Sequence, residues 1–113
     1  MTIIKSYTDL DQSLKLVEFL SPESADMYYS NRIDKKYQGA LPIEYKRGNP
    51  LLSQEIAAWS LTALLTILPS ATLDSSNNHY YRIHCMERYT EWYDNAIDAC
   101  YEMIIRLNEL KML

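Results

Sequence analysis

The longest uncharged apolar stretch of the chain is residues 56–68, read IAAWSLTALLTIL, and it ends at Pro69. Its only polar side chains are Ser60, Thr62 and Thr66. At 100° per residue, a helix here would place the two threonines on one narrow side and leave apolar groups over most of its surface. A bilayer span would need about 20 apolar residues, so this run is too short to cross a membrane. The pattern predicts a buried central helix.

Apolar positions at helical spacing also occur before this run. The stripe they form consists of Leu10, Leu14, Val17 and Leu20, widened by Leu16 and Phe19. It predicts a helix over residues 9–20, with Thr8 and Asp11 as a capping box at its start. A Ser-Pro pair at residues 21–22 predicts a second, short helix that ends near residue 29.

Residues 30–49 lack clear periodicity and contain both glycines of the chain, Gly39 and Gly48. This composition predicts a long surface loop, with a short extended piece at residues 41–45. Ser53, which is followed by Gln and Glu, is the expected cap of the central helix.

Period-two alternation begins at residue 80. Residues 80–85 and 89–93 both alternate, which predicts two strands of a hairpin that turns near residues 86–88. Residues 70–79, read SATLDSSNNH, have the composition of a turn. Large side chains stand on both faces of the predicted hairpin.

A last helix is expected to begin at Asn95, its cap, with Asp98 in the third position. Its core face consists of Ile97, Cys100, Ile104 and Leu107, flanked by Ala96, Met103 and Leu110. Taken together, the elements predict an α+β fold in a single domain, residues 1–113. We expect three main helices around a buried central helix, with a small antiparallel hairpin or meander.

Composition narrows the function classes. Hydrophobic residues make up 48% of the chain and only two residues are Gly, which argues against disorder. The net charge of −4 gives no general attraction to a phosphate backbone, so duplex nucleic acid is disfavoured as a partner. The N-terminal sequence has no leader-like apolar stretch, so a cytoplasmic location is expected. In that compartment Cys85 and Cys100 are expected to be buried thiols.

Three segments together resemble a known group of proteins. They are SADMYY at residues 24–29, AAWSLTALLTILP at residues 57–69 and DNAIDACYEMI at residues 94–104. Their order is similar to that in small uncharacterised proteins of gut Bacteroidetes and their phages or prophages. The resemblance implies an α+β fold and a mobile-element origin, but no activity and no site residues. Ala96 is a departure, because similar proteins tend to have Pro there.

Catalytic and metal-binding patterns are weak. His84 and Cys85 are neighbours on a predicted strand, so their side chains should point to opposite faces and cannot chelate one metal ion. Neither a zinc motif nor a glycine-rich phosphate loop occurs in the sequence. We therefore expect no metal, no cofactor and no enzymatic activity; a small enzyme with a dispersed site is an alternative.

A basic segment interleaved with tyrosines is the candidate binding site. It consists of Tyr28, Tyr29, Arg32, Lys35, Lys36, Tyr37, Tyr45, Lys46 and Arg47. Three interpretations stay open. The tyrosines could pack on the core while the cations stay solvated. The segment could bind a protein partner, because aromatic and Arg side chains form interface hot spots. It could also bind single-stranded nucleic acid by stacking and phosphate contact.

The leading prediction is a non-enzymatic, cytoplasmic accessory protein of a phage or mobile element that acts by contact with a protein partner. A homodimer is also predicted, with Trp92 and Ile105 as candidate contacts. Ile105 lies on the polar side of the last helix, and Met112 and Leu113 end the chain without sequence to cover them. A two-fold contact would bury these groups. The competing interpretation is that residues 30–49 cover the hairpin within one chain.

Overall fold

The computed structural model describes residues 5–30, 43–44, 55–77 and 79–113. The helical elements in this part of the chain are α1 (Leu10–Leu16), the 3-10 turn η1 (Pro22–Ser24), α2 (Leu61–Ile67) and α3 (Ala96–Glu109). The strands are β1 (Met27–Ser30), β2 (Ile43–Glu44), β3 (Glu55–Ala58), β4 (Thr72–Ser75), β5 (Tyr81–Cys85) and β6 (Arg88–Tyr89). Two antiparallel sheets form, in the orders β2-β1-β3 and β4-β5-β6. The predicted α+β class is confirmed.

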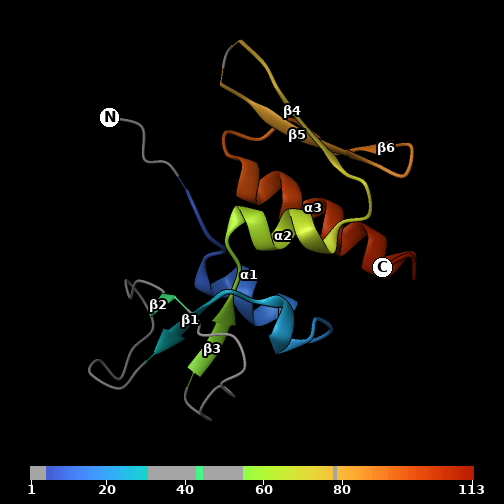
Figure 1. Cartoon of the computed structure of the whole chain (residues 1–113). Helices are drawn as coiled ribbons and strands as arrows, with labels where there is room; N and C mark the ends of the chain where they lie inside the picture. The colour runs from blue at the N-terminus through green and yellow to red at the C-terminus, as the bar shows by residue number, and fades with distance from the viewer. Residues whose placement is uncertain (1–4, 31–42, 45–54, 78) are drawn as a thin grey trace.

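The two sheets lie on opposite sides of the helices. In Figure 1, α2 and α3 run side by side through the middle of the molecule, and the β4-β5-β6 sheet lies above α3. The β2-β1-β3 sheet lies at the other end, where β3 contacts α1. One face of the β4-β5-β6 sheet is therefore covered by α3, while the opposite face has no helix over it in the described chain.

The N-terminal helix differs from its prediction at both ends. Its cap is Asp9, whose Oδ1 accepts a hydrogen bond from Gln12 N at 2.8 Å, while Gln12 Oε1 accepts one from Asp9 N at 3.1 Å. The Thr8 hydroxyl is not available for capping, because it accepts from Trp59 N. The helix ends at Leu16, and the expected core residues Leu14 and Val17 are exposed.

The prediction of one helix over residues 56–68 is wrong, because its first part is strand β3. Met27 pairs with Ala58 and Ser30 with Glu55. The short helix expected up to residue 29 begins as predicted, with Ser21 as its cap, but it is a 3-10 turn that ends at Ser24, and strand β1 follows from Met27. Helix α2 is capped by Ser60, whose Oγ accepts from Ala63 N, and not by Ser53. The apolar residues of this run do not by themselves distinguish a buried strand from a buried helix. The boundary lies at Ser60, a residue type that commonly caps helices.

The predicted arrangement around a buried central helix is not confirmed. Helix α2 buries Ala63 and Leu64 but exposes Thr62 and Thr66. Helix α3 contributes more to the core, with buried residues Ile97, Ala99, Cys100, Met103, Ile104 and Leu107. The prediction for this helix is therefore confirmed in its cap and its core face; only Leu110, 49% exposed, departs from it.

The hairpin is confirmed in its first strand and its turn, but its second strand is Arg88–Tyr89 and not residues 89–93. A strand that the sequence did not predict precedes it. Strand β4 lies in the stretch interpreted as a turn and pairs with β5, Leu73 opposite Ile83. Met86 and Glu87 form the tight turn between β5 and β6, both with positive φ (52° and 65°). Positive φ at both central residues is the geometry that two-residue hairpin loops favour, although neither residue is Gly or Asn.

A buried polar cluster joins the N-terminal segment and α1 to the β2-β1-β3 sheet. Thr8 N donates to Trp59 O at 2.9 Å, and the hydroxyl of Tyr29 donates to Thr8 O at 2.8 Å. The Thr8 and Ser13 hydroxyl oxygens lie 2.8 Å apart. These bonds satisfy groups that would otherwise be costly to bury, and they attach α1 to the β1–β3 pair.

Candidate functional site

The face of the β4-β5-β6 sheet that points away from α3 carries two exposed aromatic side chains, Tyr89 and Trp92, next to Arg82. Along β5 the side chains of Ile83 and Cys85 are buried against the helices, so those of Arg82 and His84 point the other way. Asp74 is opposite Arg82, and Tyr89 is opposite His84. We define the outer face as Asp74, Arg82, His84, Tyr89 and Trp92.

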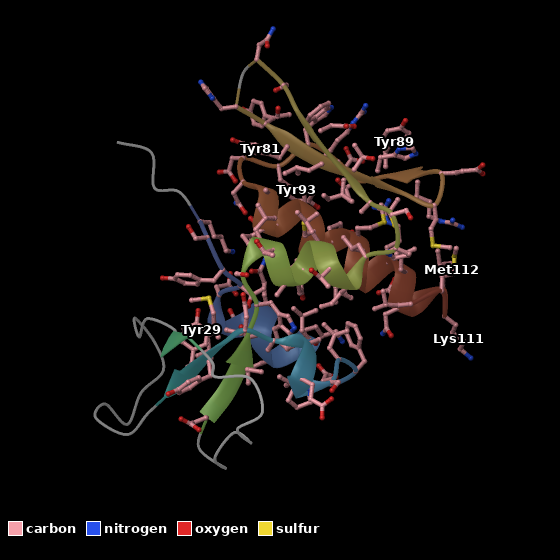
Figure 2. The ribbon with its side chains drawn as sticks, in the orientation of Figure 1. Tyr29, Tyr81, Tyr89, Tyr93, Lys111 and Met112 are labelled. Atoms are coloured by element: carbon pink, nitrogen blue, oxygen red, sulfur yellow. The ribbon has the colours of Figure 1, made fainter. Side chains whose placement is uncertain are left out.

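Figure 2 shows how the tyrosines divide between the two sides of this sheet. Tyr93 lies on the side toward α3, where it pairs with Tyr81 in an isolated bridge, and Tyr89 lies on the side away from the helix. Burial raises the pKa of Tyr93, with the negative charge of Glu102 adding to the effect. Tyr93 packs against the core, whereas Tyr89 faces solvent.

Arg82 is held between two aromatic rings. Its guanidinium carbon is 4.3 Å from the centroid of the Tyr89 ring and 4.6 Å from that of the Trp92 ring. Both distances are within the range of a cation–π contact. Its Nε also donates to Asp74 Oδ2 at 3.1 Å, which fixes the inner end of the guanidinium.

His84 extends this arrangement into a row. Its ring stacks on Tyr89 with centroids 4.2 Å apart and planes inclined by 7°. His84 and Arg82 are equally close to the Tyr89 centroid, and two groups at that distance cannot share one face of a ring. The order across the outer face is therefore His84, Tyr89, Arg82, Trp92.

Much of this row is open to solvent. Tyr89 is 49% exposed and Trp92 is 44% exposed, and Tyr80 nearby is 46% exposed. Single exposed aromatic residues are ordinary, but a cluster that contains Tyr, Trp and Arg is typical of an interaction surface. The row offers aromatic stacking surfaces and hydrogen-bond donors, which are groups that can contact a ligand or a partner.

The basic segment is mostly outside the described residues. That holds for Arg32, Lys35, Lys36, Tyr37, Tyr45, Lys46 and Arg47. Tyr28 is half-buried in β1, and Tyr29 is 3% exposed. Burial raises the pKa of Tyr29 to about 12. Tyr29 thus fits the interpretation in which tyrosines pack on the core, since its ring and hydroxyl are both occupied inside the protein.

The two candidate dimer contacts have different surroundings. Trp92 is exposed on the outer face, whereas Ile105 is half-buried and packs against the core. Met112 also packs against the core, because the chain turns back after α3 and Met112 N donates to Leu107 O at 2.8 Å. The expectation that Ile105 and Met112 are left uncovered is therefore wrong; Leu113 is 44% exposed.

The cysteines are structural. Both are unpaired and buried, and Cys85 Sγ donates to Pro69 O at 3.2 Å. Burial raises the pKa of Cys100 to about 12, so its thiolate, the reactive form, is suppressed.

No three His, Cys, Asp or Glu side chains of the described chain lie together as metal ligands. Within the same residues, no helix is long and apolar enough to cross a membrane.

A shallow groove of about 330 Å³ lies between η1 and α2. Asp26 on its wall accepts hydrogen bonds from Ser60 N at 2.9 Å and from Ser60 Oγ, and the Thr66 hydroxyl donates to Thr62 O. The Asp26 carboxylate and the Thr66 hydroxyl are thus already engaged in contacts within the protein. The groove is a weaker candidate than the outer face.

Sequence reasoning named Trp92, as a candidate dimer contact, but missed its neighbours on the outer face. The alternation along β5 already separated Arg82 and His84 from the buried positions. What was lacking was the register, which brings Tyr89 beside His84 and Asp74 beside Arg82.

Comparison of the chain with protein-family models, with curated proteins and with solved structures gives no match.

Proposed function

We propose that the protein is a non-enzymatic binding protein that contacts a protein partner through the outer face. The carrying observation is the guanidinium of Arg82 stacked between the rings of Tyr89 and Trp92. Tyr, Trp and Arg are the side chains that most often dominate protein interfaces. Arg82 is already ordered by its contacts, so binding through it would cost little conformational entropy.

Charge favours a protein over single-stranded nucleic acid. Exposed rings could stack on bases, but the chain carries a net charge of −4. Asp74 neutralises Arg82, and exposed Glu87 and Glu91 lie on and beside the hairpin. A phosphate backbone would meet these carboxylates, which opposes the counterion-driven binding on which such proteins depend.

An accessory role in a phage or mobile element of Bacteroidetes is proposed on the resemblance of the three sequence segments alone. The fold class agrees with the one that this resemblance implies. The resemblance names no site residue, so the proposal that the outer face binds a partner is supported only by the contacts seen in the structure.

Affinity capture with matched surface variants tests the proposal. The tagged protein, its Trp92→Ala variant and a Leu14→Ala variant are incubated with lysate of the bacterial host. Leu14 is the control because it is as exposed as Trp92, at 44%, but lies on α1. A protein captured by wild type and Leu14→Ala, but lost with Trp92→Ala, supports binding through the outer face. Capture that is equal for all three variants, or no specific capture, rejects it.

A further inference from the structure

The outer end of Arg82 is free. The guanidinium Nε is bonded to Asp74, whereas the two Nη groups have no hydrogen-bond partner in the described part of the chain. The side chain is 33% exposed. Because Tyr89 and Trp92 lie on the guanidinium and Asp74 on its Nε, we infer that the Nη edge is part of the exposed surface. Four N–H donors thus remain to be satisfied by water or by a ligand.

The guanidinium is held in one orientation by three contacts. Tyr89 and Trp92 restrict it to the space between their rings, and Asp74 sets which edge points inward. The edge formed by the two Nη groups therefore points away from Asp74. A planar fork held in this way matches the two oxygens of a carboxylate, which a lysine ammonium cannot do.

We propose that the outer face recognises an acidic segment of a partner protein, with one carboxylate bound to the Nη edge of Arg82 and a neighbouring apolar side chain on Trp92. This inference rests on the proposed function and names the chemistry of the partner. Trp92 is 44% exposed, and Arg82 lies over its ring at 4.6 Å, so an apolar group can cover the remaining surface. Covering that surface removes apolar area from water, which favours binding.

Three other ligand classes fit less well. A cationic group cannot enter between the rings, because Arg82 already fills that space. A phosphate carries up to two negative charges and would be repelled more strongly than a carboxylate by Asp74. A single nucleotide could stack its base on Trp92 and place a singly charged phosphodiester on the Nη groups. The further phosphates of a strand would then meet exposed Glu87 and Glu91, whereas a protein segment needs only one carboxylate at Arg82.

Selection from a display library of random 12-residue peptides tests the inference, with the full chain as bait. We expect the bound peptides to be enriched in Asp or Glu next to an apolar residue. Affinity of the best peptide is then measured for the wild type, Arg82→Lys, Trp92→Ala and Arg88→Gln. Arg88 is the matched control, a second hairpin arginine whose Nη1 is bonded to Met86 O at 3.2 Å.

Arg82→Lys keeps the charge but removes the fork, so we expect affinity to fall at least about 10-fold, the scale of a charged hydrogen-bond pair. Arg88→Gln should change it less than about 2-fold. Asp74→Asn supplies a variant whose effect has the opposite sign. Its amide oxygen can still accept from Arg82 Nε, and loss of the repelling charge should strengthen binding roughly 2- to 5-fold. A merely disturbed sheet would weaken it.

The outcomes separate the two proposals. Peptides without an acidic residue that still require Trp92 would overturn the carboxylate inference and leave the proposed function in place. The absence of any peptide that depends on Trp92 would overturn both. Replacing the selected Asp or Glu by phosphoserine tests the source of the anion, and tighter binding of the phosphopeptide would replace the acidic segment with a phosphorylated one.

Discussion

Lys5 Nζ lies 2.8 Å from Asp98 Oδ1, although 93 positions separate the two residues in the sequence. The contact attaches the chain before α1 to the first turn of α3. Gln12 Nε2 donates to the same carboxylate oxygen at 2.8 Å, and Asn95 Nδ2 donates to the other at 2.8 Å. Asp98 is thus a junction between the N-terminal helix and the last helix.

This junction predicts a dependence of stability on acid. Burial by itself would raise the pKa of Asp98, but hydrogen bonds from Lys5, Asn95 and Gln12 outweigh it and lower the pKa below its ordinary value. A carboxyl whose folded-state pKa is lowered contributes stability above its unfolded pKa, about 3.9, and loses it as pH falls through the folded value. Asp98→Asn should therefore cost about 1–2 kcal/mol at pH 7 and less at pH 3.

Urea unfolding of wild type and Asp98→Asn at pH 7, 5 and 3 measures this difference. Asp11→Asn is the control, since Asp11 is an exposed carboxylate in the first turn of α1. Its effect should be smaller, at the scale of about 0.5 kcal/mol for an exposed helix-terminus charge. A difference for Asp98→Asn that does not change with pH would show that the charge of Asp98 contributes nothing.

Core packing of α2 predicts a large cost for truncation. Leu64 is fully buried, so Leu64→Ala should lower the free energy of unfolding by about 2–5 kcal/mol. Leu14→Ala removes the same atoms from a side chain that is 44% exposed, and should cost less than about 1 kcal/mol. Urea melts compare the two. Equal losses would place Leu64 outside the core.

The thiols predict slow labelling of the folded protein. Cys100 is fully buried with a pKa raised to about 12, and burial also raises the pKa of Cys85. At pH 8 in the absence of urea, reaction with a thiol reagent should be at least about 100-fold slower than in the unfolded chain, because it requires opening of the fold. Cys85→Ser and Cys100→Ser assign each rate. Fast labelling at either position would contradict the burial.

The parts of the fold that were predictable are those with a periodicity that the tertiary structure does not override. Helix α3 has a cap at Asn95 and an apolar face at helical spacing, and both signals agree. Strand β5 alternates, so its buried and exposed positions could be assigned in advance. In residues 56–68 the apolar pattern could not decide between strand and helix, because a buried strand and a buried helix both consist of apolar residues.

Long-range pairing decided the remaining elements and the site. Residues 55–58 become strand because β1 pairs with them, and Thr72–Ser75 becomes strand because β5 does. Local sequence contains neither partner, and the polar composition of residues 70–79 indicated a turn. The row on the outer face could not be predicted for the same reason, because it depends on long-range strand pairing. Only the register of β4, β5 and β6 places Arg82 between Tyr89 and Trp92.

The homodimer is a prediction that the outer face makes testable. Of its two candidate contacts, Ile105 packs against the core of its own chain, so the argument for self-association now depends on Trp92. A face that serves a different protein should stay open in solution, and light scattering at micromolar concentration should then give the monomer mass of 13.2 kDa. Twice that mass, returning to the monomer value in Trp92→Glu but not in Leu14→Glu, would show that a second copy covers the outer face. Ile105→Glu is unsuitable as a test, because placing a charge against the core would destabilise the fold whatever the oligomeric state.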